Sequence, residues 1–181
     1  LLIIYFFPNN DVSIKEHLSY IKNDEMPIFL IDDKDYVART SIVKSSKNIN
    51  DQIKEIIETL TINSQKSNYI RDGFKPIIPK DTKVLDLKLD SEILTINFSK
   101  EFLNVSKENE DKMIEALIYS LTEIKEIKKI KILVENNNFT TLPNSNKKLP
   151  EYLDKNYGIN KIYNLDSLKE TSKTTIYYLS K

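Results

Sequence analysis

Several kinds of side chain that carry out enzyme chemistry are missing or rare in this sequence. Its 181 residues include no cysteine, no tryptophan, one histidine and two glycines. The lack of cysteine excludes disulfides, thiol nucleophiles and thiolate zinc sites, and a single histidine excludes metal motifs that need two. With only Gly73 and Gly158 available, a glycine-rich phosphate loop is excluded too. We therefore expect no bound metal and no cofactor.

Charge of one sign is not in excess either. The 27 Lys and Arg side chains balance 27 Asp and Glu side chains, so the formal net charge is zero. Nucleic-acid-binding domains usually carry a basic excess on one face, and we expect no nucleic-acid partner here. A composition of 40% apolar and 30% charged residues is typical of a folded domain.

Long hydrophobic runs are also absent. The run Leu1–Phe7 stops at Pro8, well short of the ~20 residues of a transmembrane helix, and it lacks the features of a signal peptide. Its β-branched and aromatic residues predict a buried strand and turn, and the alternative is the end of an upstream membrane anchor. Because the chain begins with Leu, we interpret it as a segment of a longer protein.

Apolar residues follow the periods of two helices and several strands. Between Ile49 and Ile62 they recur every three or four residues, with Asn48 or Asn50 as the cap, and a second such stripe follows Ser106. Period-two alternation predicts strands at residues 28–30, 37–43, 83–89, 94–98 and 130–134. We expect an α+β fold with one mixed, mainly antiparallel sheet and both amphipathic helices on one face. In the hairpin near residue 90, we expect the buried face to include Leu85, Leu87 and Leu89.

The chain divides into three parts. Residues 1–142 are predicted to form one α/β domain, and residues 143–173 a connector packed on it. In residues 174–181 an Ile is followed by two aromatic residues, as it is near the start of the chain. This similarity predicts either a last strand or the start of a truncated second repeat. The connector residues expected to anchor it are Leu149, Tyr152, Leu153, Tyr157, Ile159 and Ile162.

Few polar residues form patterns that suggest a site. His17 has no recognisable catalytic partner and is interpreted as a surface or loop residue, with a general base as the alternative. Asp32, Asp33 and Asp35 could bind Ca²⁺, but they lack the glycine and glutamate spacing of a calcium loop. A solvated turn is the simpler interpretation, as it is for Asp24–Glu25.

Two further groups of charged residues have a similarly simple explanation. Asp86, Asp90 and Glu92 could supply the two carboxylates of a glycosidase, yet exposed strand positions explain them. The basic run is interleaved with glutamates and is interpreted as a solvated face; it comprises Lys125, Lys128, Lys129 and Lys131. We predict no catalytic, cofactor-binding or metal-ligating residue, and the pattern identifies no binding residue.

Four stretches in order carry a resemblance to a known family. They are Ile77–Leu85, Thr95–Phe102, Glu115–Ile124 and Ile127–Val134. Together they resemble the GerMN (sporulation and spore germination) family over roughly Ile3 to Glu135. Two positions depart from its pattern, since Asp81 and Asn136 stand where glycine is common; Asn can adopt the same left-handed turn.

The resemblance implies a non-catalytic module of endospore-forming bacteria that lies outside the membrane and is often lipid-anchored. It also implies a fold like that of ring-building modules, tandem copies, and partners among envelope or sporulation-complex proteins, self-association included. Membrane attachment would come only through an anchor upstream of residue 1. The alternative function is a module that binds peptidoglycan, another glycan or a small ligand, through exposed tyrosines and the loop near Asp32. A cell-wall enzyme is the least favoured hypothesis.

Overall fold

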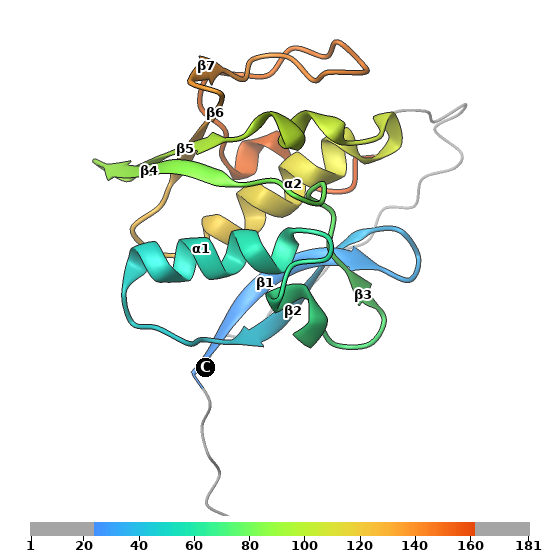
Figure 1. The fold of residues 1–181 in the computed structure, drawn as a ribbon, viewed down its shortest axis with the longest axis vertical. Helices are drawn as coiled ribbons and strands as arrows, with labels where there is room; N and C mark the ends of the chain where they lie inside the picture. Colours follow the sequence, from blue (N-terminus) through green and yellow to red (C-terminus); the bar gives the residue numbers. More distant parts are fainter. Residues whose placement is uncertain (1–23, 162–181) are drawn as a thin grey trace, which may run out of the picture.

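The computed structural model describes residues 24–161, which form two sheets with two helices between them. In Figure 1 the sheet with strand order β2-β1-β3 lies below the helices, and the sheet with order β4-β5-β6-β7 lies above them. The strands are β1 (Glu25–Asp32), β2 (Val37–Val43), β3 (Phe74–Lys75), β4 (Val84–Asp90), β5 (Ile93–Phe98), β6 (Lys129–Val134) and β7 (Asn137–Asn138). The helices are α1 (Ile49–Leu60) and α2 (Glu110–Leu121), with short 3₁₀ turns at Lys66–Tyr69, Lys100–Asn104, Lys107–Asn109 and Lys155–Tyr157.

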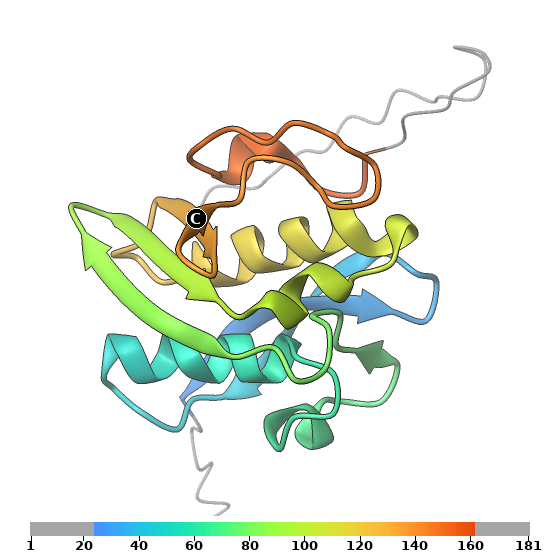
Figure 2. The same ribbon diagram turned by 45° about the horizontal axis from the view of Figure 1, so that its top comes forward.

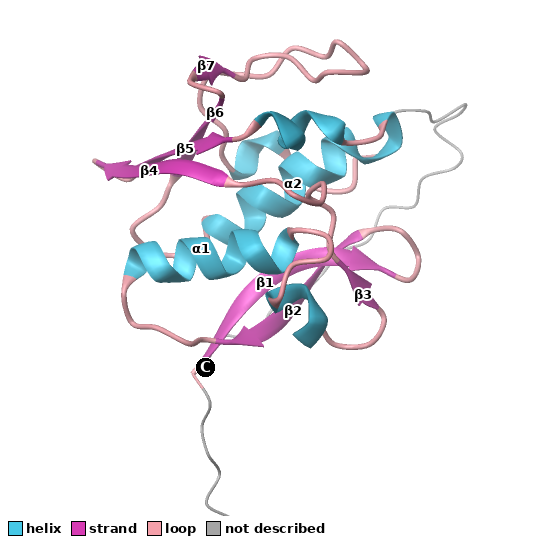
Figure 3. Ribbon diagram, viewed as in Figure 1, coloured by secondary structure: helices cyan, strands magenta, loops and turns pink. Residues whose placement is uncertain are grey.

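The α+β class is therefore confirmed, but the described strands form two sheets where the sequence pattern predicted one. The burial of α2 gives the physical reason, because nine of its twelve residues are buried. A helix that is buried nearly all round needs protein on opposite sides. Figures 1 and 3 show this arrangement, in which the helices cover one face of each sheet.

The strands predicted at residues 28–30 and 37–43 and the first predicted helix are present, and β1 extends beyond the predicted strand at both ends. β1 and β2 pair antiparallel, from Glu25 opposite Val43 to Ile31 opposite Val37. At the start of α1, the side-chain oxygen of Asn48 accepts hydrogen bonds from the backbone N–H groups of the second and third following residues, at 2.8 and 3.3 Å. Asn48, and not Asn50, is thus the N-cap.

The β4–β5 hairpin is present, but its buried face differs by one residue from the prediction. A β-bulge interrupts the register between Val84 and Asp86, so Leu85 has no partner in β5. A bulge shifts the in-and-out alternation of the strand by one position. Leu85 is consequently 48% exposed, and its predicted burial is wrong, whereas Leu87 and Leu89 pack against the core.

The chain returns from β5 through α2 to β6, which pairs parallel to β5 (Figure 2). Helix α2 begins at Glu110, four residues after Ser106, because a 3₁₀ turn comes first. After β6 the chain reverses at Asn136, whose φ is +65°, and Asp81 has the same φ. Both positions where glycine is common in the GerMN pattern thus have left-handed backbone.

Residues beyond the second sheet pack back on it. Leu149 and Leu153 are buried, and Leu153 exchanges two backbone hydrogen bonds of 2.8 Å with Ile130 of β6. Tyr157 and Ile159 pack partly buried against the core, but Tyr152 is 40% exposed, so its predicted anchoring role is wrong. The predictions for Leu1–Phe7, His17, Ile162 and residues 174–181 lie outside the described residues.

Candidate functional site

The acidic turn between β1 and β2 is held by its own hydrogen bonds and ion pairs. Asp32 Oδ1 accepts hydrogen bonds from the backbone N–H groups of Lys34 and Tyr36, both at 2.9 Å. Asp35 pairs with the Lys112 ammonium of α2, whose hydrogen bond holds the pKa of Asp35 below its usual range. Within residues 24–161, no three His, Asp or Glu side chains are grouped so that they could hold a metal ion.

The other charged residues considered from the sequence are largely exposed. Asp86 and Asp90 are exposed on β4, and Glu92 belongs to the turn before β5, with a φ of +68°. In the basic run, Lys131 forms an ion pair with Glu151 at 2.8 Å, and the other three lysines are exposed to solvent. The structure does not bring these groups together into a site.

Two glutamates of α2, which the sequence did not single out, are almost completely buried. Glu110 is 1% exposed and Glu115 is 2% exposed. Burial raises the pKa of Glu115, which is only partly opposed by a 2.9 Å hydrogen bond from the backbone N–H of Asn160. The Asn160 side chain in turn forms two 2.8 Å hydrogen bonds with the backbone of Val37. Glu115 therefore serves as a buried acceptor that ties residue 160 to the start of β2.

We expect Glu115→Gln to stabilise the protein at neutral pH, because glutamine keeps an acceptor for Asn160 without a buried charge. The raised pKa means that Glu115 favours the folded state at low pH, and that this contribution is lost as the pH rises through the folded-state pKa. The advantage of the variant should therefore grow from pH 4 to pH 7.5. Urea unfolding at both pH values measures it; a variant that is less stable at pH 7.5 would contradict this role.

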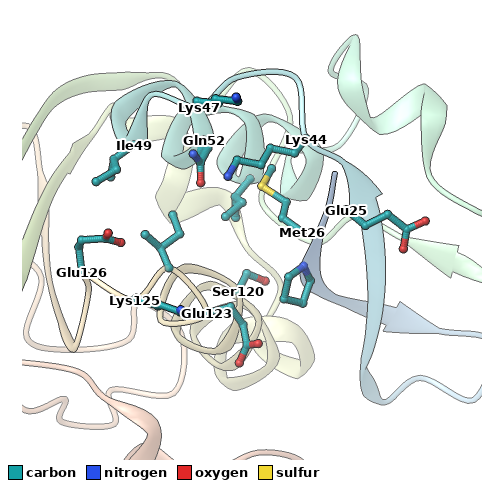
Figure 4. Close-up of a pocket in the computed structure, with 13 residues that line it drawn as sticks. Glu25, Met26, Lys44, Lys47, Ile49, Gln52, Ser120, Glu123, Lys125 and Glu126 are labelled. Carbon is teal, nitrogen blue, oxygen red and sulfur yellow. The ribbon is translucent and has the colours of Figure 1, made fainter. Parts of the chain in front are cut away.

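A cavity of about 390 Å³ lies where the start of β1, the beginning of α1 and the end of α2 meet. Figure 4 shows its lining side chains. Its apolar walls come from β1, from α1 and from the segment just after α2, and they consist of Met26, Pro27, Ile49, Ile56 and Ile124. Its charged residues are Glu25, Lys44, Lys47, Glu123, Lys125 and Glu126. Pockets of this size and mixed lining commonly hold part of a ligand.

Two polar side chains line the cavity between these walls. Ser120 is fully buried, and its hydroxyl accepts a 2.8 Å hydrogen bond from the backbone N–H of Phe29 in β1. Gln52 is 7% exposed, and its side chain is directed from α1 into the cavity (Figure 4). The described residues of the cavity thus offer an amide group and apolar contact area, both of which can contact a ligand.

Sequence reasoning did not find this cavity, and the reason is local. Gln52 follows Asp51 in the polar first turn of α1, where a glutamine looks solvent-exposed. Its burial depends on the end of α2 packing across α1, which brings together residues about 70 positions apart. A faint signal was present, because Gln52 stands one position before Ile53 and four before Ile56, on the apolar side of the helix.

Exposed aromatic side chains occur on the described surface, as the contact-surface hypothesis requires. Tyr69 is 84% exposed, Tyr36 51% and Tyr152 40%. They belong to a 3₁₀ turn, the β1–β2 turn and the segment after β7, respectively. Among residues 24–161, no helix is both long and apolar enough to cross a membrane.

Comparison with known proteins gives one family. The model of a family described as sporulation and spore germination (Germane) matches residues 4–140. The spore germination protein GerM of Bacillus subtilis (strain 168) is 30% identical over 156 residues, or 84% of this chain. Those residues are 42% of GerM, so the chain spans less than half of that relative.

Solved structures show the same fold. The tandem GerMN domains of the sporulation protein GerM from Bacillus subtilis match with a TM-score of 0.71 and 24% identity, over 80% of this chain and 51% of that one. The first GerMN domain of GerM alone matches with a TM-score of 0.68 and 23% identity, over 73% of this chain and 98% of that one. A candidate lipoprotein from Clostridium perfringens matches with a TM-score of 0.50 and 26% identity, over 77% of this chain and 93% of that one.

Proposed function

Because this chain belongs to the sporulation and spore germination (GerMN) family, we propose that it is a non-enzymatic structural module that acts through protein–protein contacts in the cell envelope. Its partners are envelope proteins or proteins of a complex between mother cell and forespore, with further copies of the same chain among them. The observation that carries the proposal is the match to GerM over 84% of the chain.

The chemistry of the chain supports a contact role. The sequence contains no thiol and one imidazole, so the usual nucleophile and base pairs are scarce. Exposed tyrosines such as Tyr69 offer large, rigid contact area with a polar tip, a side chain favoured at protein interfaces. The outer edge of β4 carries a bulge and the charged residues Asp86, Lys88 and Asp90, devices that discourage unspecific strand pairing.

The proposal extends to location and domain organisation. We place the module outside the cytoplasmic membrane and attached through an anchor upstream of residue 1; the candidate lipoprotein among the similar structures supports this. We also propose one domain at residues 1–142, a connector at 143–173 and, at 174–181, a terminal strand or the start of a second repeat. The tandem GerMN domains of GerM support the repeat.

Site-specific photo-crosslinking in sporulating cells tests the function. A crosslinking amino acid would replace Tyr36, Tyr69 or Tyr152 in the full-length protein, and adducts would be identified by mass spectrometry. We expect adducts with envelope proteins or with a second copy of the chain, absent from unirradiated cells. If none of the three positions gives such an adduct, the proposal fails. Saturable binding to purified peptidoglycan that is lost in Tyr69→Ala would support the glycan-binding alternative instead.

A further inference from the structure

The Gln52 side chain offers the cavity in Figure 4 an amide group that has no hydrogen-bond partner among the described residues and remains open to the cavity. The residue as a whole is 7% exposed, and no residue in the range 24–161 hydrogen-bonds to its amide; because no fully buried side-chain nitrogen or oxygen in that range lacks a partner, the amide atoms keep access to the cavity. An amide that is open to a cavity and is not paired within the protein can form hydrogen bonds with a ligand without breaking an internal one. Its two donors and its acceptor face the cavity, and they can pair with a ligand amide on both sides at once.

Positive charge is in excess around the cavity once the glutamates that form ion pairs with residues outside it are set aside. Glu25 pairs with Arg71 at 3.3 Å, and Glu123 pairs with Lys155 at 2.7 Å. Among the described residues, the three cavity lysines form no ion pair within 4 Å, and Glu126 is the remaining carboxylate. These lysines are Lys44, Lys47 and Lys125. The cavity therefore favours a ligand with negative charge.

The walls favour an aliphatic side chain over a sugar. Met26, Ile56 and Ile124 contribute flexible or branched apolar surface, and none of the lining residues within the range 24–161 is aromatic. Aromatic rings provide the flat apolar faces on which ring-shaped ligands stack, so their absence weighs against a glycan. A volume of about 390 Å³ is at the lower end of the range for ligand pockets, which suits a short piece of chain.

From the amide, the charge and the walls, we propose that this cavity binds an extended peptide segment of a partner protein, in which an acidic residue stands next to an aliphatic one. The peptide backbone amide pairs with Gln52, the aliphatic side chain lies against Met26, Ile56 and Ile124, and the carboxylate faces Lys44 and Lys47. The inference rests on the proposed function, since it names the kind of partner segment that the module would hold.

The test uses the full ¹⁵N-labelled chain and short capped peptides followed by NMR. We expect acetyl-Asp-Leu-amide to shift the Gln52 side-chain resonances saturably, with a dissociation constant in the millimolar range, and acetyl-Lys-Leu-amide to bind more weakly. No saturable shift with the acidic peptide would overturn the proposal. So would equal shifts with N-acetylglucosamine, or contacts of the free Gln52 amide with residues 1–23, which would show the cavity already filled.

Gln52→Leu is the decisive variant, and Gln65→Leu is its matched control on an exposed glutamine. We expect Q52L to weaken peptide binding about tenfold, because the amide pair with the peptide is lost. The Tm should not fall, because no residue in the range 24–161 hydrogen-bonds to the Gln52 amide. Q65L should leave binding unchanged. Undiminished binding in Q52L would overturn the proposal.

The same variant separates this inference from the proposed function. If Q52L loses peptide binding and also an envelope adduct in cells, both proposals are supported. If adducts persist in Q52L and no peptide binds the wild-type chain, only the peptide site is wrong.

Discussion

Replacing Phe102 with alanine is expected to lower the free energy of unfolding by about 3–5 kcal/mol. Phe102 has no exposed surface, and its ring stacks on Phe98 at 4.4 Å and meets Phe139 edge-on at 5.5 Å between ring centres. It thereby joins the end of β5 to the residue after β7. Alanine would leave a cavity between these two rings, which cannot close without moving the sheet.

Urea unfolding followed by circular dichroism measures the loss caused by Phe102→Ala. Since small domains are stable by only ~5–15 kcal/mol, part of the variant population should be unfolded at 37 °C. The neighbouring Leu103 is 39% exposed, and Leu103→Ala is the matched control with a change below about 1 kcal/mol. A loss below about 1 kcal/mol for Phe102→Ala would mean that this aromatic cluster does not stabilise the second sheet as described.

Glu110→Gln is expected to cost about 2 kcal/mol at pH 7. The buried carboxylate accepts hydrogen bonds of 3.0 Å from the backbone N–H of Ser145 and from the Asn144 side chain, and a third from the Asn144 backbone. It thus fastens the loop after residue 142 to the first turn of α2, where the helix dipole also favours a negative charge. A glutamine would turn an N–H group toward one of these donors and leave it unpaired.

The cost of Glu110→Gln should depend on pH. Burial by itself would raise the pKa of Glu110, but the hydrogen bonds from Ser145 and Asn144 outweigh it and hold the pKa below its usual range. The stability that Glu110 contributes is therefore present above the ordinary glutamate pKa and lost as the pH falls through the folded-state value. Urea unfolding at pH 7 and pH 3.5 should show a smaller difference from wild type at the acidic pH.

Two variants make the Glu110 result interpretable. Glu126→Gln, on an exposed residue, should change the free energy of unfolding by less than about 0.5 kcal/mol. Glu115→Gln, one and a half turns further along α2, should stabilise the protein at neutral pH. The opposite signs follow from the number of donors that face each carboxylate, and equal effects of the two substitutions would contradict this explanation.

The local elements were predictable because each depends on neighbours in the sequence. A cap at Asn48 or Asn50, the apolar stripe of α1 and the two strands before it depend on neighbours within a few residues, so the sequence pattern predicted them; the structure decided that Asn48 is the cap. The prediction for Leu85 was wrong because a bulge leaves no mark in an alternating sequence. Tyr152 was misjudged for a similar reason, since an aromatic residue in an irregular segment can point either way.

The candidate site could not be predicted from local sequence patterns. Composition excluded thiol and two-histidine chemistry, and the order of four motifs identified the family, since both are properties of the chain alone. The cavity around Gln52 and the burial of Glu110 and Glu115 were decided by tertiary packing. Each depends on contacts between elements tens of residues apart, whose burial and charge balance exist only once the two sheets enclose the helices.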